Sequence, residues 1–427
     1  MTDSPAESVN TLLIASVGGT CEPVVQTLLR WRPVRAVFVP TRETRHFIEP
    51  ICESARAAGF VLPDANRDEC MLPSGENLTA CIHALRRLDG FVADWLRRGQ
   101  GFRLAVDYTG GTKTISGALV LWARRWPCIF SYVGGKARTR DGVGVVITGQ
   151  EQVVACSNPW NALGYQAAEQ ACAAFDSGRF GTAERILEDT RVRVDEQRVK
   201  QEMTALFSVV NAYSAWDRFD HRAAVNKLAQ LNRYENDLRA VLGEQPAAEL
   251  LELSLEHREF LEKIVNSADA TTELVRDLLA NALRRAREDR YDDAVARLYR
   301  AVEAWAQIRL RDGFGIDTSQ VPCDRIPEPL RDRWMPRAAS GNLSIGLQDA
   351  YELLEALGDP VGSDFRNLDL NGPKSPLAAR NRSILAHGWH PISRSDYDAL
   401  WSKLQALTCI APDQLPRFPK LSAVAVP

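Results

Sequence analysis

The sequence of 427 residues lacks the patterns that build disulfide frameworks and metal sites. Its nine cysteines are scattered and form no C-x-x-C pair, and its six histidines include no H-E-x-x-H motif. An odd number of scattered cysteines in a chain of this length indicates reduced thiols rather than disulfides or a zinc site. We therefore expect neither a bound metal nor a metal-dependent cofactor.

Long apolar segments and a strong net charge are also missing. The longest apolar stretch, around residues 118–123, is far too short to cross a bilayer. Residues 1–5 lack the basic and apolar regions of a signal peptide, so we expect a cytoplasmic protein with no membrane partner. A net charge of −3 provides no global basic field, and any nucleic acid would have to be held locally, in a cleft.

Two regions of different pattern follow one another along the chain. Up to about residue 155, runs of Val, Ile and Leu alternate with helical stretches, which is typical of an α/β domain with a doubly wound, mostly parallel, Rossmann-like sheet. From residue 158 onward, helical periodicity predicts an all-α bundle. We therefore expect three domains, over residues 1–157, 158–270 and 271–427, and interpret the middle one as a helical spacer.

The pattern also predicts individual elements of both regions. We expect helices over residues 23–31, 42–59, 78–98 and 114–126 and strands over residues 12–17, 34–39, 102–107, 128–133 and 143–148. Later in the chain, an arginine and an aromatic residue recur together ahead of an alanine. These pairs resemble turns of helical hairpins, but their irregular spacing favours stacked helix pairs over a repeat array. They are Arg179-Phe180, Arg218-Phe219 and Arg290-Tyr291.

Glycine pairs follow two of the expected strands. In open α/β sheets, ligands bind beyond the carboxyl ends of the strands, where the strand order reverses. Glycine lets a backbone approach a ligand, and a helix N-terminus attracts anions. The pattern therefore predicts a phosphate site, although tight turns beside a solvated lysine would produce the same pattern. The predicted site residues are Gly18, Gly19, Thr20, Thr109, Gly110, Gly111, Thr112 and Lys113.

Two familiar nucleotide motifs do not fit these glycine loops. Thr112 stands where the G-K-[ST] end of a Walker A loop needs glycine, and the dinucleotide fingerprint G-x-G-x-x-G is absent. An ATPase and a dehydrogenase are therefore disfavoured.

A second candidate site lies near the C-terminal end. Ser375 as N-cap, Pro376 at the first position and Gly388 as terminator predict a helix over Pro376–His387. Arg380 and His387 are almost two turns apart, so they share a face and lie about 10 Å apart along the axis at roughly 1.5 Å per residue. Arginine grips phosphate and histidine moves protons near neutral pH, a pair suited to metal-independent phosphodiester cleavage.

Several alternatives remain open at this second site. Arg382 also fits as the active arginine by spacing, although it points about 140° away from His387 at roughly 100° per residue. His390 lies past the end of the helix and fits a loop residue near the site. A cation is in any case favoured at a helix C-terminus, and Arg380 fits an ordinary surface residue. A symmetric dimer would supply both groups twice and close the distance between them.

Both segments resemble known families. The run D-Y-T-G-G-T-K-T-I-S-G-A over residues 107–118 resembles the signature of CARF domains in type III CRISPR ancillary effectors, a likeness that covers roughly the first 155 residues. The run from Arg380 to His387 resembles the R-x(4–6)-H motif of HEPN ribonucleases, in which a polar residue, here Asn381, follows the arginine. Together they resemble the effector ribonucleases of type III CRISPR immunity that cyclic oligoadenylate activates.

The resemblance implies a function for each part of the chain. It implies a CARF-like sensor over residues 1–157 that binds cyclic oligoadenylate at the glycine loops of a homodimer. It further implies a HEPN-like endoribonuclease over residues 271–427, in which Arg380, Asn381 and His387 cut single-stranded RNA without a metal. Two other functions stay open, namely a ligand-sensing regulatory protein without nuclease activity and a HEPN toxin of a toxin–antitoxin pair.

Overall fold

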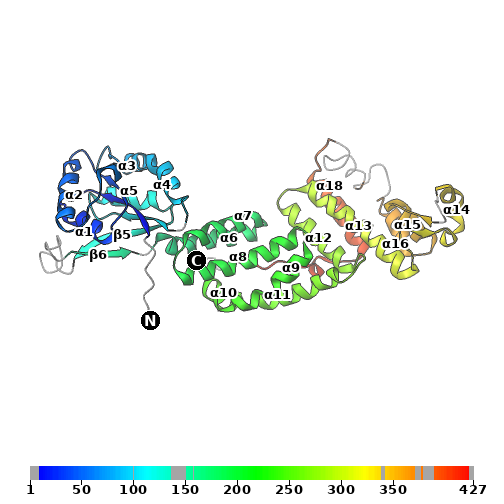
Figure 1. Ribbon diagram of the computed structural model, residues 1–427. Helices are drawn as coiled ribbons and strands as arrows, with labels where there is room; N and C mark the ends of the chain where they lie inside the picture. The colour runs from blue at the N-terminus through cyan, green and yellow to red at the C-terminus, as the bar shows by residue number, and fades with distance from the viewer. Residues whose placement is uncertain are drawn as a thin grey trace. The chain divides into compact units, whose positions relative to one another are not determined.

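The computed structural model describes residues 9–99, 101–135, 151–156, 158–337, 342–370, 377 and 389–422 (Figure 1). The chain divides into two compact units. The first contains the described residues up to Ala168 together with Ile186–Thr204, and the second contains Glu169–Arg185 and the described residues from Ala205 onward. None of the described helices combines the length and apolar character that crossing a membrane requires.

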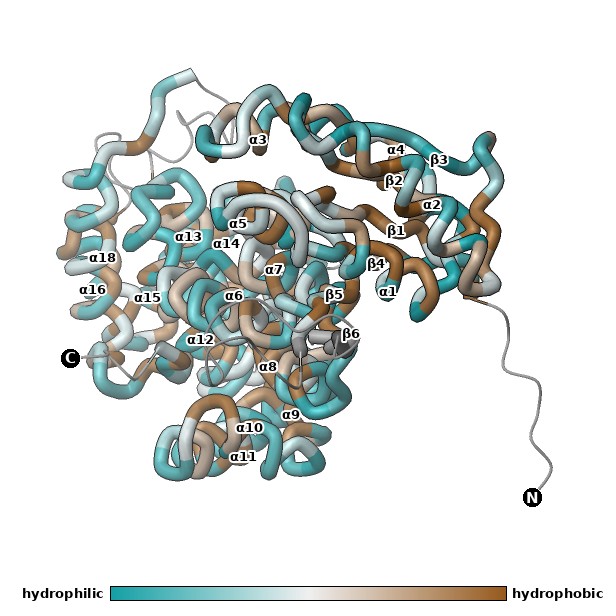
Figure 2. The backbone as a smooth tube through the Cα atoms, turned by 90° about the vertical axis from the view of Figure 1, so that its left-hand side faces the viewer, coloured by the Kyte–Doolittle hydropathy of each residue, from teal (hydrophilic) through white to brown (hydrophobic). Residues whose placement is uncertain are grey.

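A six-stranded sheet forms the centre of the first unit, in the order β3-β2-β1-β4-β5-β6. Strands β1 to β5 pair in parallel, and β6 pairs antiparallel with β5 at the edge. The central strands β1, β2 and β4 are rich in hydrophobic residues (Figure 2), which confirms the expected doubly wound α/β fold. The strands are β1 Asn10–Ser16, β2 Arg35–Val39, β3 Arg67–Glu69, β4 Phe102–Asp107, β5 Cys128–Gly135 and β6 Glu151–Cys156.

Helices cover both faces of this sheet with separate cores. Helices α1 and α2 pack on one face, and α3, α4 and α5 pack on the other. The expected helix over residues 78–98 is two helices, joined by a 3₁₀ turn and tied to α5 where Asp89 accepts a hydrogen bond from Trp122 Nε1 (2.8 Å). The helices are α1 Glu22–Trp31, α2 Ile48–Ala57, α3 Leu78–Leu85, α4 Asp89–Leu96 and α5 Lys113–Ala123.

Two strand expectations differ from the structure. Strand β3 was not expected because its residues are charged, and it is held at the sheet edge by the ion pair of Arg35 with Asp68 (2.7 Å). The strand expected over residues 143–148 lies outside the described residues. The strand that pairs back on β5 is β6, at residues 151–156.

The rest of the chain is helical, as expected. The division between the two units falls within α6, α7 and α8. A two-stranded pair of β7 with β8 and the short helix α14 lie in the glycine- and proline-rich stretch after α13. The elements are α6 Pro159–Asp176, α7 Phe180–Arg193, α8 Gln197–Asp217, α9 His221–Leu228, α10 Glu235–Leu242, α11 Glu244–Val265, α12 Thr272–Arg287, α13 Tyr291–Phe314, β7 Val321–Pro322, α14 Glu328–Trp334, β8 Asn342–Leu343, α15 Leu347–Ala356, α16 Pro360–Asn367 and α18 Arg394–Thr408.

Three hairpin turns in this region share one backbone closure. In each turn, the residue two positions before the next helix is left-handed: Gly178, Phe219 and Asp289, with φ of 78°, 63° and 57°. The following amide donates to the carbonyl five residues earlier, which is a Schellman closure. The predicted hairpins are confirmed. Arg218-Phe219, however, lies two positions earlier in its turn than the other two pairs do.

An aromatic cluster in the second unit holds the C-terminal segment, residues 412–422. The ring of Phe418 lies 4.9 Å from that of Tyr213 and 4.8 Å from that of Trp216, both on α8. The guanidinium of Arg284, on α12, lies 4.0 Å from the centre of the Phe418 ring. His257 completes the cluster from α11, with its Nδ1 3.0 Å from the Tyr213 hydroxyl. The C-terminal segment therefore joins α8 to α12.

The same segment is also fixed to the end of α6. The backbone amides of Leu421 and Ser422 donate to the Asp176 carboxylate, at 2.8 Å and 2.9 Å. Lys420 Nζ donates to the Asp176 carbonyl oxygen (3.0 Å). One carboxylate at a helix end thus orders the last described residues of the chain.

A buried polar network connects α8 and α9 to α12. The fully buried carboxylate of Asp277 accepts from Trp216 Nε1 and lies beside His221 Nε2, both at 2.8 Å. Asp217 pairs with Arg285 at 2.6 Å, and both side chains are buried. Buried ion pairs of this kind demand defined geometry, because losing one partner leaves a charge uncompensated.

The buried His257 predicts a pH dependence of stability. Burial, together with the charge of nearby Arg284, lowers the pKa of His257 to about 4. An unfolded histidine titrates near pH 6.5, so the folded chain loses stability as pH falls from about 6.5 to about 4, by roughly 3 kcal/mol. Urea unfolding followed by circular dichroism at several pH values should show this slope. His257→Gln should reduce it, and His83→Gln, at an exposed position, should not; equal slopes in all three proteins would contradict the prediction.

Candidate functional site

The sheet topology brings the two glycine loops to one edge. Strand β1 pairs with β2 on one side and with β4 on the other, so the strand order reverses between β1 and β4. Ala15 and Asp107 are paired in register, which places the carboxyl ends of both strands at the same level. Helices α1 and α5 then begin just beyond these ends. This is the position at which doubly wound sheets bind ligands.

The two loops touch through their backbones. A Cβ atom on Gly110 would overlap the carbonyl oxygen of Ser16 and lie 2.8 Å from the amide nitrogen of Gly18. A Cβ atom on Gly18 would lie 2.7 Å from the amide nitrogen of Gly111. Gly18 and Gly110 are buried. These two glycines are therefore needed for the packing of one loop on the other, whether or not a ligand is present.

Asp107, the last residue of β4, holds the second glycine loop in place by hydrogen bonds. Its buried carboxylate accepts hydrogen bonds from the Thr109 amide (3.0 Å) and from the Thr27 hydroxyl on α1 (2.9 Å). Burial raises the pKa of the Asp107 carboxyl. The Thr109 hydroxyl accepts from the Val133 amide (2.7 Å), so it ties the loop to β5. Sequence reasoning missed Asp107 and Thr27, whose partnership spans 80 residues and leaves no local pattern.

The hydroxyl of Thr112 also forms hydrogen bonds within the protein. It caps α5 by accepting from the Ile115 amide (3.3 Å), and it donates to the carbonyl oxygen of Gly75. The segment before α3 therefore also reaches this edge, which the sequence did not reveal. Thr109 and Thr112 thus have bonding roles in the fold in addition to any role toward a ligand.

The remaining predicted residues face solvent. Gly19, Thr20, Gly111 and Lys113 are exposed, and a Cβ atom on Gly19 would meet nothing within 4 Å. Lys113 begins α5 and forms no salt bridge with any residue that the structure describes. One uncompensated cation thus lies at a helix N-terminus beside an accessible loop, an arrangement that favours an anion.

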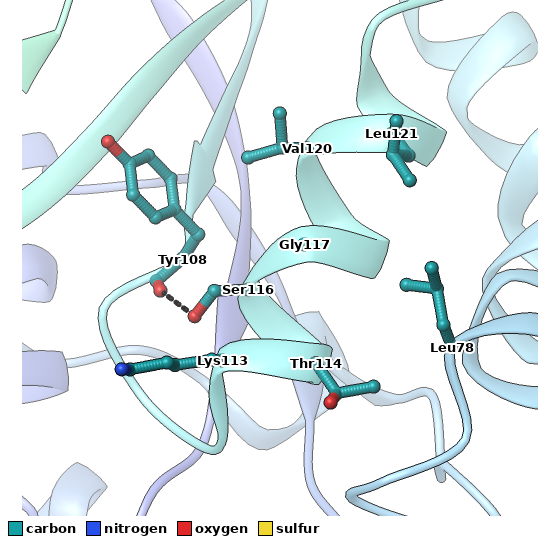
Figure 3. A pocket seen from close by; sticks show the side chains of 8 residues that line it. All are labelled: Leu78, Tyr108, Lys113, Thr114, Ser116, Gly117, Val120 and Leu121. Atoms are coloured by element: carbon teal, nitrogen blue, oxygen red, sulfur yellow. Dashed lines mark hydrogen bonds between the residues drawn. The ribbon is translucent and has the colours of Figure 1, made fainter.

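An open hollow of ≈ 520 Å³ lies along α5 next to this edge (Figure 3). Lys113 and the ring of Tyr108 lie toward one side of the helix, and Leu78 and Leu121 lie on the other. The Ser116 hydroxyl donates to the Tyr108 carbonyl oxygen (2.8 Å), which holds the glycine loop against the first turns of α5. The hollow therefore combines a cation, an aromatic ring and an apolar wall.

The predicted catalytic residues Arg380, Asn381 and His387 lie outside the described residues, as does Arg382. Leu377 and Ile392, on either side of them, are buried in the core that α13 and α18 also form. His390 is exposed. Among the described residues, no group of three or more His, Cys, Asp or Glu side chains could hold a metal ion.

Comparison with protein families identifies the helical region. Residues 163–257 match the Csm6 6H domain, and residues 264–410 match the Csm6 HEPN domain. The chain belongs to the CARF–HEPN effectors of type III CRISPR systems. Its HEPN domain identifies this effector as a ribonuclease of CRISPR defence.

Similar solved structures share little sequence with this effector. Csm6 of Enterococcus italicus bound to cyclic hexa-2'-fluoro-hexa-dAMP is 12% identical, with 95% of this chain and 96% of that chain covered and a TM-score of 0.44. VC1899 of Vibrio cholerae (9% identity, 49% and 68% covered) and Can2 of Sulfobacillus thermosulfidooxidans in complex with cyclic tetra-adenylate (10%, 50% and 68%) both have TM-scores of 0.25. A comparison with curated proteins finds no match.

The contact between the two loops predicts that alanine substitution will lower stability at Gly110 but not at Gly19. Gly110→Ala should destabilise the α/β unit by about 1–3 kcal/mol, because the new Cβ meets backbone atoms that cannot move independently. Gly19→Ala, which meets open space, should leave stability unchanged. Thermal unfolding of both variants measures the difference. Equal midpoints for the two variants would show that the loops do not pack as described.

Proposed function

We propose that cyclic oligoadenylate binds at the β1–β4 edge and activates metal-independent cleavage of single-stranded RNA in a homodimer. The observation that carries this proposal is that one chain joins an accessible sheet edge, at the point where the strand order reverses, to a HEPN domain. In the sensor, Gly18, Gly19, Thr20 and the segment 109–113 form the activator site. In the nuclease, Arg380, Asn381 and His387 carry the reaction.

Phosphate recognition would rest on few groups. A Cβ atom on exposed Gly19 would meet nothing within 4 Å, so this glycine leaves room for the activator's backbone, and the amide groups at the start of α5 face the same edge. Lys113 adds a full positive charge at that helix end. Because a cyclic oligonucleotide carries several phosphates, two copies of this arrangement suit it better than one.

An exposed apolar surface formed by α5 and the start of α3 supports a dimer. Leu78 and Leu121 are 41% and 45% exposed, and Gly117 and Val120 lie in the same hollow (Figure 3). A second copy that covers this face would bring two Lys113 side chains to one shared pocket. A ring with even symmetry matches a pocket on a two-fold axis.

The proposed chemistry needs one acid–base group and one cation. His387 takes the proton of the RNA 2′-hydroxyl, whose oxygen attacks the adjacent phosphorus. Arg380 stabilises the charge that develops on the phosphorane, and Asn381 supplies an amide beside it. The 5′-oxygen leaves with a proton from a histidine, which leaves a 2′,3′-cyclic phosphate. A partner chain would supply the second histidine for this step.

Substitution of the motif residues tests the nuclease assignment. Arg380→Ala and His387→Ala should each lower activator-stimulated RNA cleavage by roughly two orders of magnitude or more, with activator binding unchanged. Arg382→Ala should have a smaller effect. Cleavage of labelled RNA, measured with cyclic tri-, tetra- and hexa-adenylate in separate reactions, gives these rates. EDTA should not change them.

Other outcomes would support the alternatives. A wild-type chain that cleaves no RNA with any of the three rings would favour a ligand-sensing protein without nuclease activity. Full activity without any ring would favour a HEPN toxin. Inhibition by EDTA would contradict the metal-independent reaction.

A single lysine tests the activator site. Lys113→Ala should weaken activator binding by roughly ten- to a hundredfold, because it removes a charge-assisted phosphate contact. The fold should be unaffected, since Lys113 is exposed. Arg124→Ala, exposed at the other end of α5, is the matched control and should bind normally. Calorimetry that finds equal affinities for both variants would place the activator elsewhere.

A further inference from the structure

One tryptophan differs from all the others in its exposure. Trp389 is 86% exposed, more than any other large hydrophobic side chain that the structure describes. The nine other tryptophans are buried or half-buried. Leaving so large an apolar surface in water is unfavourable, because an aromatic side chain of this size can bury 150–250 Å² or so. Single exposed hydrophobic residues are common on protein surfaces, so the case for a partner rests on how this indole is held and on the residues that follow it.

The chain is fixed to the helical core shortly after Trp389. Three residues later, Ile392 is buried, and its amide donates to the Asp292 carboxylate at the start of α13 (3.1 Å). Ser393 then starts α18 with a capping box that includes Asp396. The indole is thus held out into solvent within three residues of a fixed point on the helical core.

The surroundings of Trp389 are polar and partly cationic. His390 and Arg394 are exposed, and 78% of the Arg394 side chain is accessible. Among the residues that the structure describes, the one ion pair of Arg394 is with Asp398, at 3.6 Å on the surface, which leaves its charge largely available to a ligand. No other exposed large hydrophobic residue lies between Trp389 and the last described residue. Protein interfaces are built around apolar cores, whereas a single aromatic ring followed closely in the chain by an exposed arginine suits nucleic acid.

We propose that Trp389 stacks on a base of the RNA substrate next to the cleaved phosphodiester, with Arg394 contacting the backbone. The inference rests on the proposed function, because His387 precedes Trp389 by only two residues. Every base presents a π-face, so the contact strengthens RNA binding without selecting a base. Trp389 is accordingly a substrate-positioning residue, and its loss should affect RNA affinity.

RNA binding by the full chain tests this contact without relying on cleavage. All variants carry His387→Ala, and a fluorescein-labelled single-stranded RNA is titrated in the presence of saturating cyclic oligoadenylate, with anisotropy as the readout. Trp389→Ala should weaken RNA binding by roughly five- to a hundredfold. Trp389→Phe should stay within about threefold, because a ring remains. Val192→Ala, at a side chain that is 72% exposed, is the control and should bind like the parent.

Each other outcome has a definite meaning. Equal RNA affinity of the Trp389→Ala variant and its parent would overturn the stacking contact. A change in oligomeric state of Trp389→Ala, seen by sedimentation velocity, would show instead that a second copy of the chain covers the indole. If Trp389→Ala binds RNA weakly while the wild-type chain cleaves none, the contact holds and the proposed nuclease function fails.

Discussion

The close backbone contact between the ends of β1 and β4 sets the geometry of the sensor. Gly110 leaves no room for a side chain against Ser16 and Gly18, so both loops leave the sheet side by side. Helix α5 consequently begins at this edge, and Lys113 lies at its first position. The buried glycines Gly18 and Gly110 thus form the tight turns that pack the two loops together, and exposed Gly19 leaves the surface of this edge accessible.

In the helical region, buried hydrogen bonds and ion pairs fix the positions of the helices, whereas in the sensor the close fit of two backbone loops fixes the position of α5. Asp277 is fully buried and is bonded by Trp216 and His221, so α8 and α9 have one preferred position on α12. The C-terminal segment packs Phe418 against α8 and bonds to Asp176 at the end of α6. Because losing one member of a buried charged pair is costly, the Asp277 contacts hold α9, α12 and the second-unit part of α8 to one another.

Hydrophobic periodicity in the sequence predicted the elements that depend on local pattern. It did not predict contacts between residues that are far apart in the chain. The parallel strands and the helical hairpins were predictable because each buries a regular apolar set. Strand β3 was not, since it has no apolar alternation and its Asp68 pairs with Arg35, which is distant in the chain and lies on β2. The roles of Thr109 and Thr112 were also hidden, because their partners Val133 and Gly75 are far away in the chain. The shared left-handed turns were recognised by their arginine–aromatic pairs, but Phe219 shows that the backbone closure, not the side-chain pair, is the common feature.

The charge balance of the chain constrains how it can hold RNA. A net charge of −3 provides little of the nonspecific attraction that basic RNA-binding proteins use, so affinity must come from a few local contacts. If the proposed RNA contact holds, the exposed indole supplies binding free energy that salt does not screen, and Arg394 adds one contact with the RNA backbone. With so few contacts to RNA, the proposed function would control cleavage through the arrangement of the catalytic groups rather than through access of the substrate.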